Sequence, residues 1–361
     1  MWYHLKNVSS LLTPALIIHL DGAKQNISEM IRIAGAASRL RPHVKTIKNA
    51  ELVALQMSQD ITKFKCATLM EAKMLASCGV KDVLWAYPIV GPNQEAFLAL
   101  QRKYPETSFS VLIDDLAQLD EWDQKLRGSH LNLFIDINVG MNRTGIVLEE
   151  VTDLISSIDK NPLLTIKGFH AYDGHNHESD LNKRTAQVTK EFEKIGQLIR
   201  SFERRAPLEL ICGGSITFPV HAKYPSRMLS PGTSLLWDAG YSHHFPDLKF
   251  EVAAVLMTRI ISKPAPHLIC LDLGHKAVAS EMKTPPVVFP ELKNYHWVSQ
   301  SEEHLILEVE SSDNLKVGAV LFGIPWHICP TVALHEKILV VAQQEVVASW
   351  KIESRKRTYQ L

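Results

Sequence analysis

The sequence predicts an α/β protein in which an N-terminal (β/α)8 TIM barrel is followed by a C-terminal β domain. Its 361 residues exceed what one hydrophobic core usually supports, which indicates about two domains. Short apolar runs alternate with helical patterns from about residue 40 to 238, as is typical of a parallel sheet. Eight such repeats favour a closed barrel over an open sheet. The Gly-x-Gly-x-x-Gly motif of dinucleotide folds does not follow the first strand.

The barrel strands are expected at eight short apolar runs, namely Pro42–Lys45, Phe64–Thr68, Asp82–Ala86, Ser108–Ile113, Leu131–Asn138, Leu164–His170, Leu208–Cys212 and a last run near Leu235–Trp237. Amphipathic stretches between them predict helices at Asn49–Ser58, Met70–Ser77, Asn93–Arg102, Leu116–Lys125 and Leu181–Phe202. Acidic and hydroxyl residues suit helix starts at Asp114-Asp115 and Ser179-Asp180.

The pattern changes near residue 240, so we expect residues 1–240 to form the barrel and residues 241–361 a separate β domain. Strand-like runs in this second part are interrupted by prolines and lie at Val252–Ile261, His267–Leu271, Leu305–Val309, Ala319–Phe322 and Lys337–Ala342. The early run Ala15–Leu20 precedes the barrel. The pattern leaves open whether residues 1–20 join the barrel or add a strand to the second domain.

Composition and charge exclude several classes of protein. The 39 Lys and Arg balance the 39 Asp and Glu, and no basic block could neutralise a nucleic-acid backbone. No apolar run approaches the roughly 18 residues of a membrane helix. Five scattered cysteines do not indicate a disulfide framework. The N-terminus lacks the apolar segment of a signal peptide, so we expect a cytoplasmic protein that binds neither nucleic acid nor membrane.

Two segments place a cation at the end of a predicted strand. Lys45 lies in the segment Arg41-Pro42-His43-Val44-Lys45-Thr46, at the carboxyl end of the first predicted strand. Barrel active sites lie at this rim, and a desolvated lysine there can form a Schiff base. By position alone, a solvated lysine at a strand end is the simpler interpretation. Arg143 lies in a glycine-flanked loop that could aim its guanidinium at a carboxylate, or that could be an ordinary turn.

Two further segments carry histidines or glycines. The run from Gly168 to His177 contains His170, Tyr172 and Asp173, which suits an acid/base cluster, a metal site or a polar surface loop. The loops Gly213-Gly214-Ser215 and Pro231-Gly232-Thr233 follow the last two strands, where barrels often bind phosphate on backbone N–H groups. Each glycine loop alone is a weak signal.

The segment Pro325-Trp326-His327-Ile328-Cys329-Pro330 contains a pair of metal-ligating residues. In extended chain, residues i and i+2 face the same side, so His327 and Cys329 could hold one metal ion. Imidazole and thiolate suit Zn²⁺. Two ligands would leave positions for water or substrate, as in a catalytic metal site. An exposed histidine beside a buried cysteine is the alternative.

Taken in order, these segments resemble the fold-type III pyridoxal-phosphate enzymes related to alanine racemase, and most closely the branch with D-threonine aldolase and metal-dependent D-serine dehydratase. The resemblance covers nearly the whole chain. It is carried by Arg41-Pro42-His43-Val44-Lys45-Thr46 with Lys48, Gly140-Met141-Asn142-Arg143-Thr144-Gly145, Tyr172-Asp173-Gly174-His175, Gly213-Gly214-Ser215, Pro231-Gly232-Thr233, Asp272-Leu273-Gly274-His275-Lys276, Ser301-Glu302-Glu303-His304 and Pro325-Trp326-His327-Ile328-Cys329-Pro330-Thr331.

The resemblance implies a barrel of the alanine racemase type and a head-to-tail homodimer. Pyridoxal 5′-phosphate would be held as a Schiff base by Lys45, with His170 under its ring and Arg143 near a carboxylate. The resemblance assigns the phosphate to Gly213, Gly214 and Ser215, with Gly232, Thr233 and Tyr172 as further candidates. A divalent metal, Zn or Mn, would lie on His327 and Cys329. Many relatives carry Arg immediately before the Pro-Gly of the eighth strand, but this chain has Ser230 there, and Arg227 is three residues off register.

The implied activity is that of a lyase on D-3-hydroxy amino acids, of the D-threonine aldolase type, which gives glycine and an aldehyde. D-serine dehydratase, which gives pyruvate and ammonia, is the first alternative, and an amino-acid racemase the next. A cofactor-carrying binding protein without turnover is disfavoured, because such proteins consist of the barrel only. The base at the β-hydroxyl stays open among His175, His177 and His304.

Overall fold

The structure is a computed structural model that describes residues 2–202, 208–282, 285–312 and 314–357. The chain folds into two compact units. The barrel unit comprises Met30–Lys45, Leu52–Gly232 and Lys356–Leu361. The second unit comprises Met1–Glu29, Thr46–Glu51 and Thr233–Arg355.

The barrel unit is built on a parallel sheet whose strands neighbour one another in sequence order. They are β2 (Lys63–Cys66), β3 (Asp82–Pro88), β4 (Ser108–Ile113), β5 (Leu131–Asp136), β6 (Leu164–Ala171), β7 (Glu209–Cys212) and β8 (Arg227–Leu229). Residues 40–44 bond to both edges of this sheet. Arg41 N–H donates to the Leu229 carbonyl at 2.8 Å, and Val44 N–H donates to the Lys65 carbonyl at 2.9 Å. The predicted barrel is thereby confirmed.

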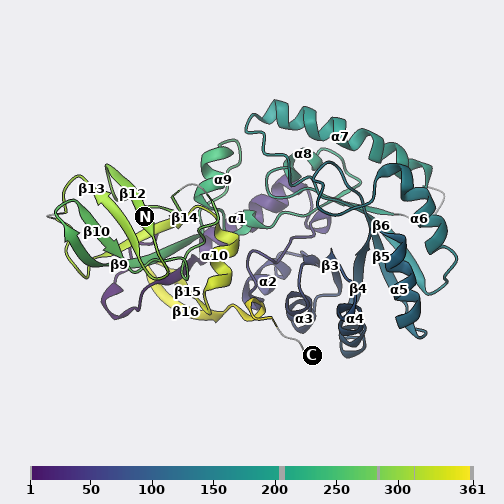
Figure 1. Cartoon of the computed structure of the whole chain (residues 1–361), viewed down its shortest axis with the longest axis horizontal. Helices are drawn as coiled ribbons and strands as arrows, with labels where there is room; N and C mark the ends of the chain where they lie inside the picture. The colour runs from purple at the N-terminus through teal and green to yellow at the C-terminus, as the bar shows by residue number, and fades with distance from the viewer. Residues whose placement is uncertain (1, 203–207, 283–284, 313, 358–361) are drawn as a thin grey trace. The chain divides into compact units, whose positions relative to one another are not determined.

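Helices follow the strands and cover the outer side of the curved sheet (Figure 1). They are α3 (Leu69–Ser77), α4 (Pro92–Lys103), α5 (Leu116–Leu126), α6 (Val151–Ile158), α7 (Leu181–Ser201) and α8 (Phe218–His221), while α1 (Leu20–Ala34) and α2 (Ala50–Met57) are each divided between the units. Asp115 accepts from Ala117 N–H at 2.7 Å and Asp180 from Lys183 N–H at 2.9 Å, which caps α5 and α7. The predicted starts of these helices are therefore confirmed.

The first and last predicted barrel strands need correction. Pro42–Lys45 forms bridges rather than a regular strand, because Pro42 has no N–H to donate to a ladder. The last strand is β8 at Arg227–Leu229, too short to show an alternating pattern. The run near Leu235–Trp237 instead lies at a helical turn, η4 (Thr233–Leu235), where Leu236 and Trp237 both donate to the Thr233 carbonyl.

The second unit contains a mixed sheet in the order β12-β13-β10-β9-β1-β15-β16, with β14 pairing β9 and β11. Its strands are β1 (Ala15–His19), β9 (Ala254–Ala265), β10 (Leu268–Leu271), β11 (Val287–Val288), β12 (Tyr295–Gln300), β13 (Leu305–Val309), β14 (Val320–Pro325), β15 (Lys337–Ala342) and β16 (Glu345–Lys351). Its helices are α9 (Ala239–His244) and α10 (Ile328–Leu334). The remaining 3-10 turns of the chain are η1 (Val8–Ser10), η2 (Ala37–Arg39), η3 (Leu148–Glu150) and η5 (Glu353–Arg355).

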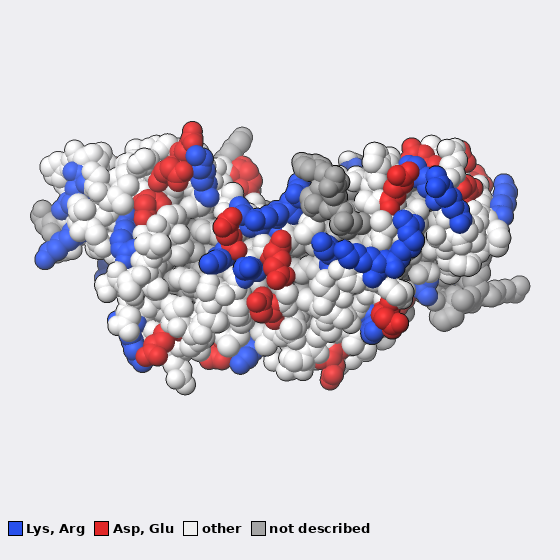
Figure 2. Space-filling view, turned by 90° about the horizontal axis from the view of Figure 1, so that it is seen from below, with Lys and Arg blue, Asp and Glu red and all other residues white. Residues whose placement is uncertain are grey.

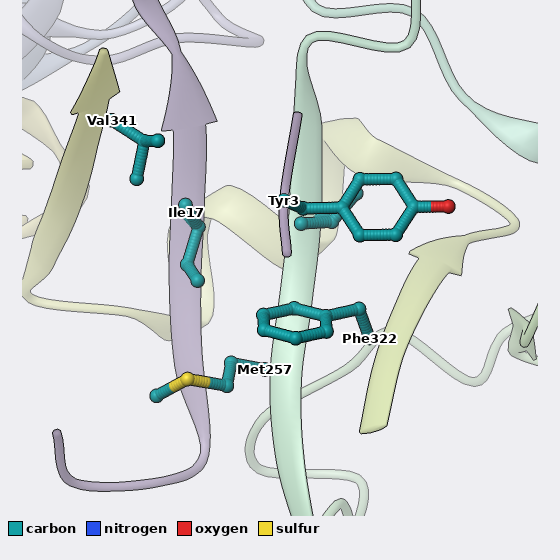
Figure 3. Packing of buried hydrophobic residues seen from close by; sticks show 6 residues of the cluster. Tyr3, Ile17, Met257, Phe322 and Val341 are labelled. Carbon is teal, nitrogen blue, oxygen red and sulfur yellow. The ribbon is translucent and has the colours of Figure 1, made fainter. Parts of the chain in front are cut away.

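Apolar packing joins the early strand β1 to this sheet. Ile17 on β1 is fully buried among Tyr3, Met257, Phe322 and Val341 (Figure 3). The rings of Tyr3 and Phe322 lie 5.6 Å apart between centroids. Because β1 pairs with β9 on one side and β15 on the other, the N-terminal residues complete the sheet of the second unit.

The surface has no single-signed field on the face shown in Figure 2, where Lys and Arg alternate with Asp and Glu in small groups. This mixture agrees with the equal numbers of positive and negative side chains in the sequence. Among the described residues, no helix combines the length and the apolar character that a membrane crossing requires.

A buried arginine ties the closing segment of the barrel to two strands. Arg41 is 1% exposed, and its guanidinium bonds Asp82 at 2.7 Å and Glu209 at 3.1 Å. Asp82 begins β3 and Glu209 begins β7. The two carboxylates are about 30% exposed, so water screens part of the attraction.

We expect Arg41→Ala to lower the free energy of unfolding by about 2–4 kcal/mol, because two carboxylates lose their buried partner. Urea denaturation measures the change. The control is Lys81→Ala, which removes an exposed ion pair with Glu106 and should cost less than about 1 kcal/mol. Equal effects of the two substitutions would contradict a structural role for Arg41.

Candidate functional site

Three basic side chains gather around the ring of Tyr172, which follows β6. Lys45 Nζ lies 5.7 Å from the ring centroid, Lys65 Nζ 5.6 Å and Arg143 Cζ 5.3 Å. A barrel presents the carboxyl ends of its parallel strands at one rim, which explains why residues distant in sequence meet here. Within the described part of the chain, Lys45 and Arg143 form no ion pair with a carboxylate. The cluster therefore suits an anionic ligand.

His170 is held below this cluster by a carboxylate. Asp136 and His170 are register partners on β5 and β6, and His170 Nδ1 lies 2.6 Å from Asp136 Oδ1. Thr144 donates to the other oxygen of Asp136 at 2.8 Å. Burial, and next the charge of Lys65, lower the pKa of His170. The imidazole is therefore neutral, with its proton on Nδ1.

The two predicted glycine loops meet beside Tyr172. The Gly213 backbone has φ +76°, a conformation that favours glycine. A Cβ on Gly214 would lie only 3.1 Å from Tyr172 Cε2, so a side chain there would crowd the ring. Gly232 N–H donates to Ser215 Oγ at 3.1 Å, which joins the loop after β8 to the loop after β7. The loops thus form a cradle of bare backbone next to the basic side chains.

A buried hydrogen-bond network supports this cradle from behind. Gly214 N–H donates to Thr217 Oγ1 at 3.0 Å, and Thr217 Oγ1 donates to Asp173 Oδ1 at 2.9 Å. His221 Nε2 lies 2.9 Å from the other oxygen of Asp173. Burial alone would raise the pKa of Asp173, but His221 and the hydrogen bonds hold it below its usual range. Since its own N–H is engaged internally, Gly214 contributes shape rather than a free donor.

Ser230, where the resemblance leads us to expect an Arg, supplies no cation. Ser230 is buried, and its hydroxyl donates to the Arg41 carbonyl at 3.0 Å. Arg227 does not replace the missing charge at the cluster. Its guanidinium lies 3.8 Å from the Tyr224 ring centroid and 2.7 Å from His221 Nδ1, within the network behind the cradle.

A second cluster, in the second unit, surrounds Cys329. Its sulfur lies 3.1 Å from Thr46 Oγ1 and 3.1 Å from Thr233 Oγ1. Thr233, expected from sequence as a phosphate contact, therefore directs its hydroxyl to this thiol. His327 Nδ1 lies 2.5 Å from Glu281 Oε1, and the backbone N–H of Ile328 donates to Asp238.

The chemistry of this cluster suits a metal with nitrogen and sulfur ligands. Burial would raise the pKa of Cys329, but His327 and the two threonine hydroxyls outweigh it and lower that pKa. Burial opposes ionisation of His327, yet Cys329 and Glu281 raise its pKa to about 9. Among the described residues, no group of three His, Cys, Asp or Glu has metal-binding geometry. The predicted metal site therefore rests on His327 and Cys329 as its two protein ligands.

Sequence reasoning missed Lys65 in the first cluster, and Glu281 and Asp238 in the second. Lys65 lies within the apolar run of β2 and Glu281 in a loop, and neither belongs to a recognisable motif. Of the three histidines left open as bases, His175 lies 3.1 Å from Glu191 of α7, whereas His177 and His304 are exposed. An unexpected lysine in an apolar strand was the one available signal for Lys65.

Comparison with known families agrees with this architecture. The family model "Alanine racemase, N-terminal domain" matches residues 18–239. A second model, "Putative serine dehydratase domain", matches residues 253–341. Since the first match covers more than half of the chain, the protein belongs to the alanine racemase N-terminal domain family. The resemblance inferred from the motifs is confirmed.

Curated relatives extend over nearly the full length. The chain is 26% identical over 357 residues to a D-threonine aldolase of Arthrobacter sp, covering 95% of this chain and 92% of the relative. It is 29% identical over 372 residues to a 3-hydroxy-D-aspartate aldolase of Paracoccus denitrificans, covering 97% and 94%. The crystal structure of a D-threonine aldolase from Filomicrobium marinum matches with a TM-score of 0.88 at 25% identity, over 96% of both chains.

We expect Gly213→Ala to lower the free energy of unfolding by about 2–3 kcal/mol, because a left-handed residue gains a Cβ at 3.0 Å from His221 and Phe218. Gly128→Ala is the matched control. At Gly128 (φ +87°) an added Cβ would have no atom within 4 Å, so this substitution should lower stability only through the backbone conformation, by about 1 kcal/mol. Thermal or urea denaturation that finds no difference would contradict the close packing of the cradle.

Proposed function

We propose that the protein is a pyridoxal-phosphate-dependent, divalent-metal-assisted lyase that cleaves D-3-hydroxy amino acids to glycine and an aldehyde. The observation that carries the proposal is the convergence of Lys45, Lys65 and Arg143 on Tyr172, beside a cradle of bare backbone. Relatives named as D-threonine and 3-hydroxy-D-aspartate aldolases support the lyase class. In this proposal the enzyme is a cytoplasmic head-to-tail homodimer.

The residues around Tyr172 fit a phosphate-bearing aromatic cofactor. Lys45 would hold it covalently. Tyr172, Gly213, Ser215 and Gly232 would surround its phosphate, with Gly214 contributing shape and Thr233 only its backbone, because its hydroxyl lies against Cys329. When bound, pyridoxal phosphate supplies an electron sink for negative charge that develops at the substrate Cα. His170 would lie against the ring as a neutral imidazole. Arg143, which is exposed at the rim, would bind the substrate carboxylate.

The cluster around Cys329 fits a divalent metal with His327 and Cys329 as ligands. A bound metal ion supplies positive charge that lowers the pKa of a substrate hydroxyl. Thr46 and Thr233 would hold the thiolate in place through their hydroxyls. Lys45 and Thr46 are consecutive residues, as are Gly232 and Thr233, so each cluster has members adjacent in sequence to members of the other.

Which bond breaks decides between the aldolase and its alternatives. If a base removes the β-hydroxyl proton, the Cα–Cβ bond breaks and its electron pair stays on Cα, which gives glycine and an aldehyde after protonation. If Lys45 removes the α-proton and the Cβ–O bond breaks, the hydroxyl leaves as water, and hydrolysis of the resulting enamine, through its imine form, gives a 2-oxo acid and ammonia. The match of residues 253–341 to a serine dehydratase domain favours D-serine dehydration as the second candidate. Racemisation is the third.

Lys45→Ala should abolish the visible absorbance of the protein reconstituted with pyridoxal phosphate, because no Schiff base can form at this position. Borohydride reduction followed by peptide mass spectrometry should place the cofactor on Lys45 in the wild type. Lys103→Ala, which changes an exposed lysine of α4, should keep both signals. A wild-type protein that gains no visible absorbance would overturn the cofactor assignment.

Incubation with D-threonine should release glycine and acetaldehyde, and EDTA should stop the reaction. His327→Ala and Cys329→Ala should each lower metal content and activity by at least about tenfold. His130→Ala, an exposed histidine, serves as the control. Pyruvate and ammonia from D-serine would support the dehydratase instead. Activity that persists after verified metal removal would contradict the metal role.

A further inference from the structure

Lys65 is a buried amine to which the proposed mechanism gives no separate task. It lies on β2 and is 3% exposed. Lys63, two residues earlier on the same strand, is 29% exposed and bonded to Glu209. Within the described residues, Lys65 bonds no carboxylate, and its Nζ lies 3.2 Å from His170 Nε2. A buried lysine bonded to a histidine rather than to an acid is costly, so its environment decides its charge.

The hydrogen bonds of His170 assign the proton of this pair. Asp136 accepts the proton on Nδ1, so a neutral ring has only a lone pair at Nε2. That lone pair accepts an N–H from Lys65. His170 cannot take up a second proton at Nε2 without losing this bond, and burial together with the charge of Lys65 lowers its pKa. The proton that can be exchanged therefore belongs to Lys65.

Lys65 faces groups of both kinds. Lys45 and Arg41 disfavour a positive charge on it, whereas Asp136 and Cys212 favour one. Burial, and next the charge of Lys45, lower the pKa of Lys65 to about 7. Both forms are populated at neutral pH. The Tyr172 ring centroid lies 5.6 Å from Lys65 Nζ, so an anion bound beside this ring would favour the charged form of Lys65.

We propose that Lys65 is a proton-exchanging residue of the barrel site, which takes up a proton from solvent when a phosphate-bearing ligand binds and so adds a positive charge to the site. The amine becomes an ammonium, and no other bond changes. The inference rests on the proposed function, since pyridoxal phosphate is the ligand in question. Lys65 would thereby supply, from β2, an interior cation in a barrel that has Ser230 at the end of β8.

Calorimetry with pyridoxine 5′-phosphate tests this proposal without turnover, because this alcohol has no aldehyde and cannot react with Lys45. Titrations of cofactor-free protein at pH 6, 7 and 8, in buffers of different ionisation enthalpy, count the protons taken up. At pH 8 the wild type should take up nearly one proton more than Lys65→Met. Above pH 7 its affinity should fall by up to about tenfold per pH unit relative to this variant. Protonation of the ligand itself cancels in the comparison.

Lys65→Arg carries a fixed charge, so it should bind without the extra proton and keep its affinity at pH 8. Lys63→Met, the matched control on the same strand, should behave as the wild type. Circular dichroism verifies folding, and the Lys65→Arg comparison decides if Lys65→Met does not fold. Proton uptake that is the same in the wild type and the Lys65 variants overturns the role of Lys65 but leaves the phosphate site standing. A wild type that does not bind the ligand overturns the proposed function as well.

Discussion

The hydrogen bond between Asp136 and His170 is the interaction on which the barrel site depends. It joins register partners on neighbouring strands at 2.6 Å and fixes the proton of the imidazole on Nδ1. The lone pair on Nε2 is then available to Lys65. Tyr172 follows two residues after His170, and its ring is the common neighbour of the three basic side chains. Loss of the carboxylate would free the ring orientation and leave the lysine without its acceptor.

The charge states of Lys65 and Cys329, one in each cluster, are controlled by different interactions. In the barrel unit, burial and the charge of Lys45 lower the pKa of Lys65 and so favour its neutral form. In the second unit, two threonine hydroxyls and a histidine stabilise a thiolate against the same burial. The covalent chain links these clusters at Lys45–Thr46 and at Gly232–Thr233.

The sequence was sufficient to predict the barrel, the second β domain and the helix caps at Asp115 and Asp180, because periodicity and capping act locally. The Tyr172 cluster could be anticipated in part, since strand ends of a barrel share one rim. The three-residue strand β8 is too short to have a period. The partner of His170 depends on register across the sheet, and the charge of Lys65 on burial. Those properties exist only after the chain has folded.

The pairing of β1 also has a consequence for biosynthesis. This strand is translated before the other strands of its sheet, and its register partners include Met257 of β9 and Leu339 of β15. Apart from Lys356–Leu361, the barrel unit ends at Gly232, which precedes both partner strands in the sequence. The N-terminal segment therefore cannot complete its native packing until both β9 and β15 have been translated. Translation of the C-terminal third, rather than closure of the barrel, sets the earliest moment at which the whole chain can be native.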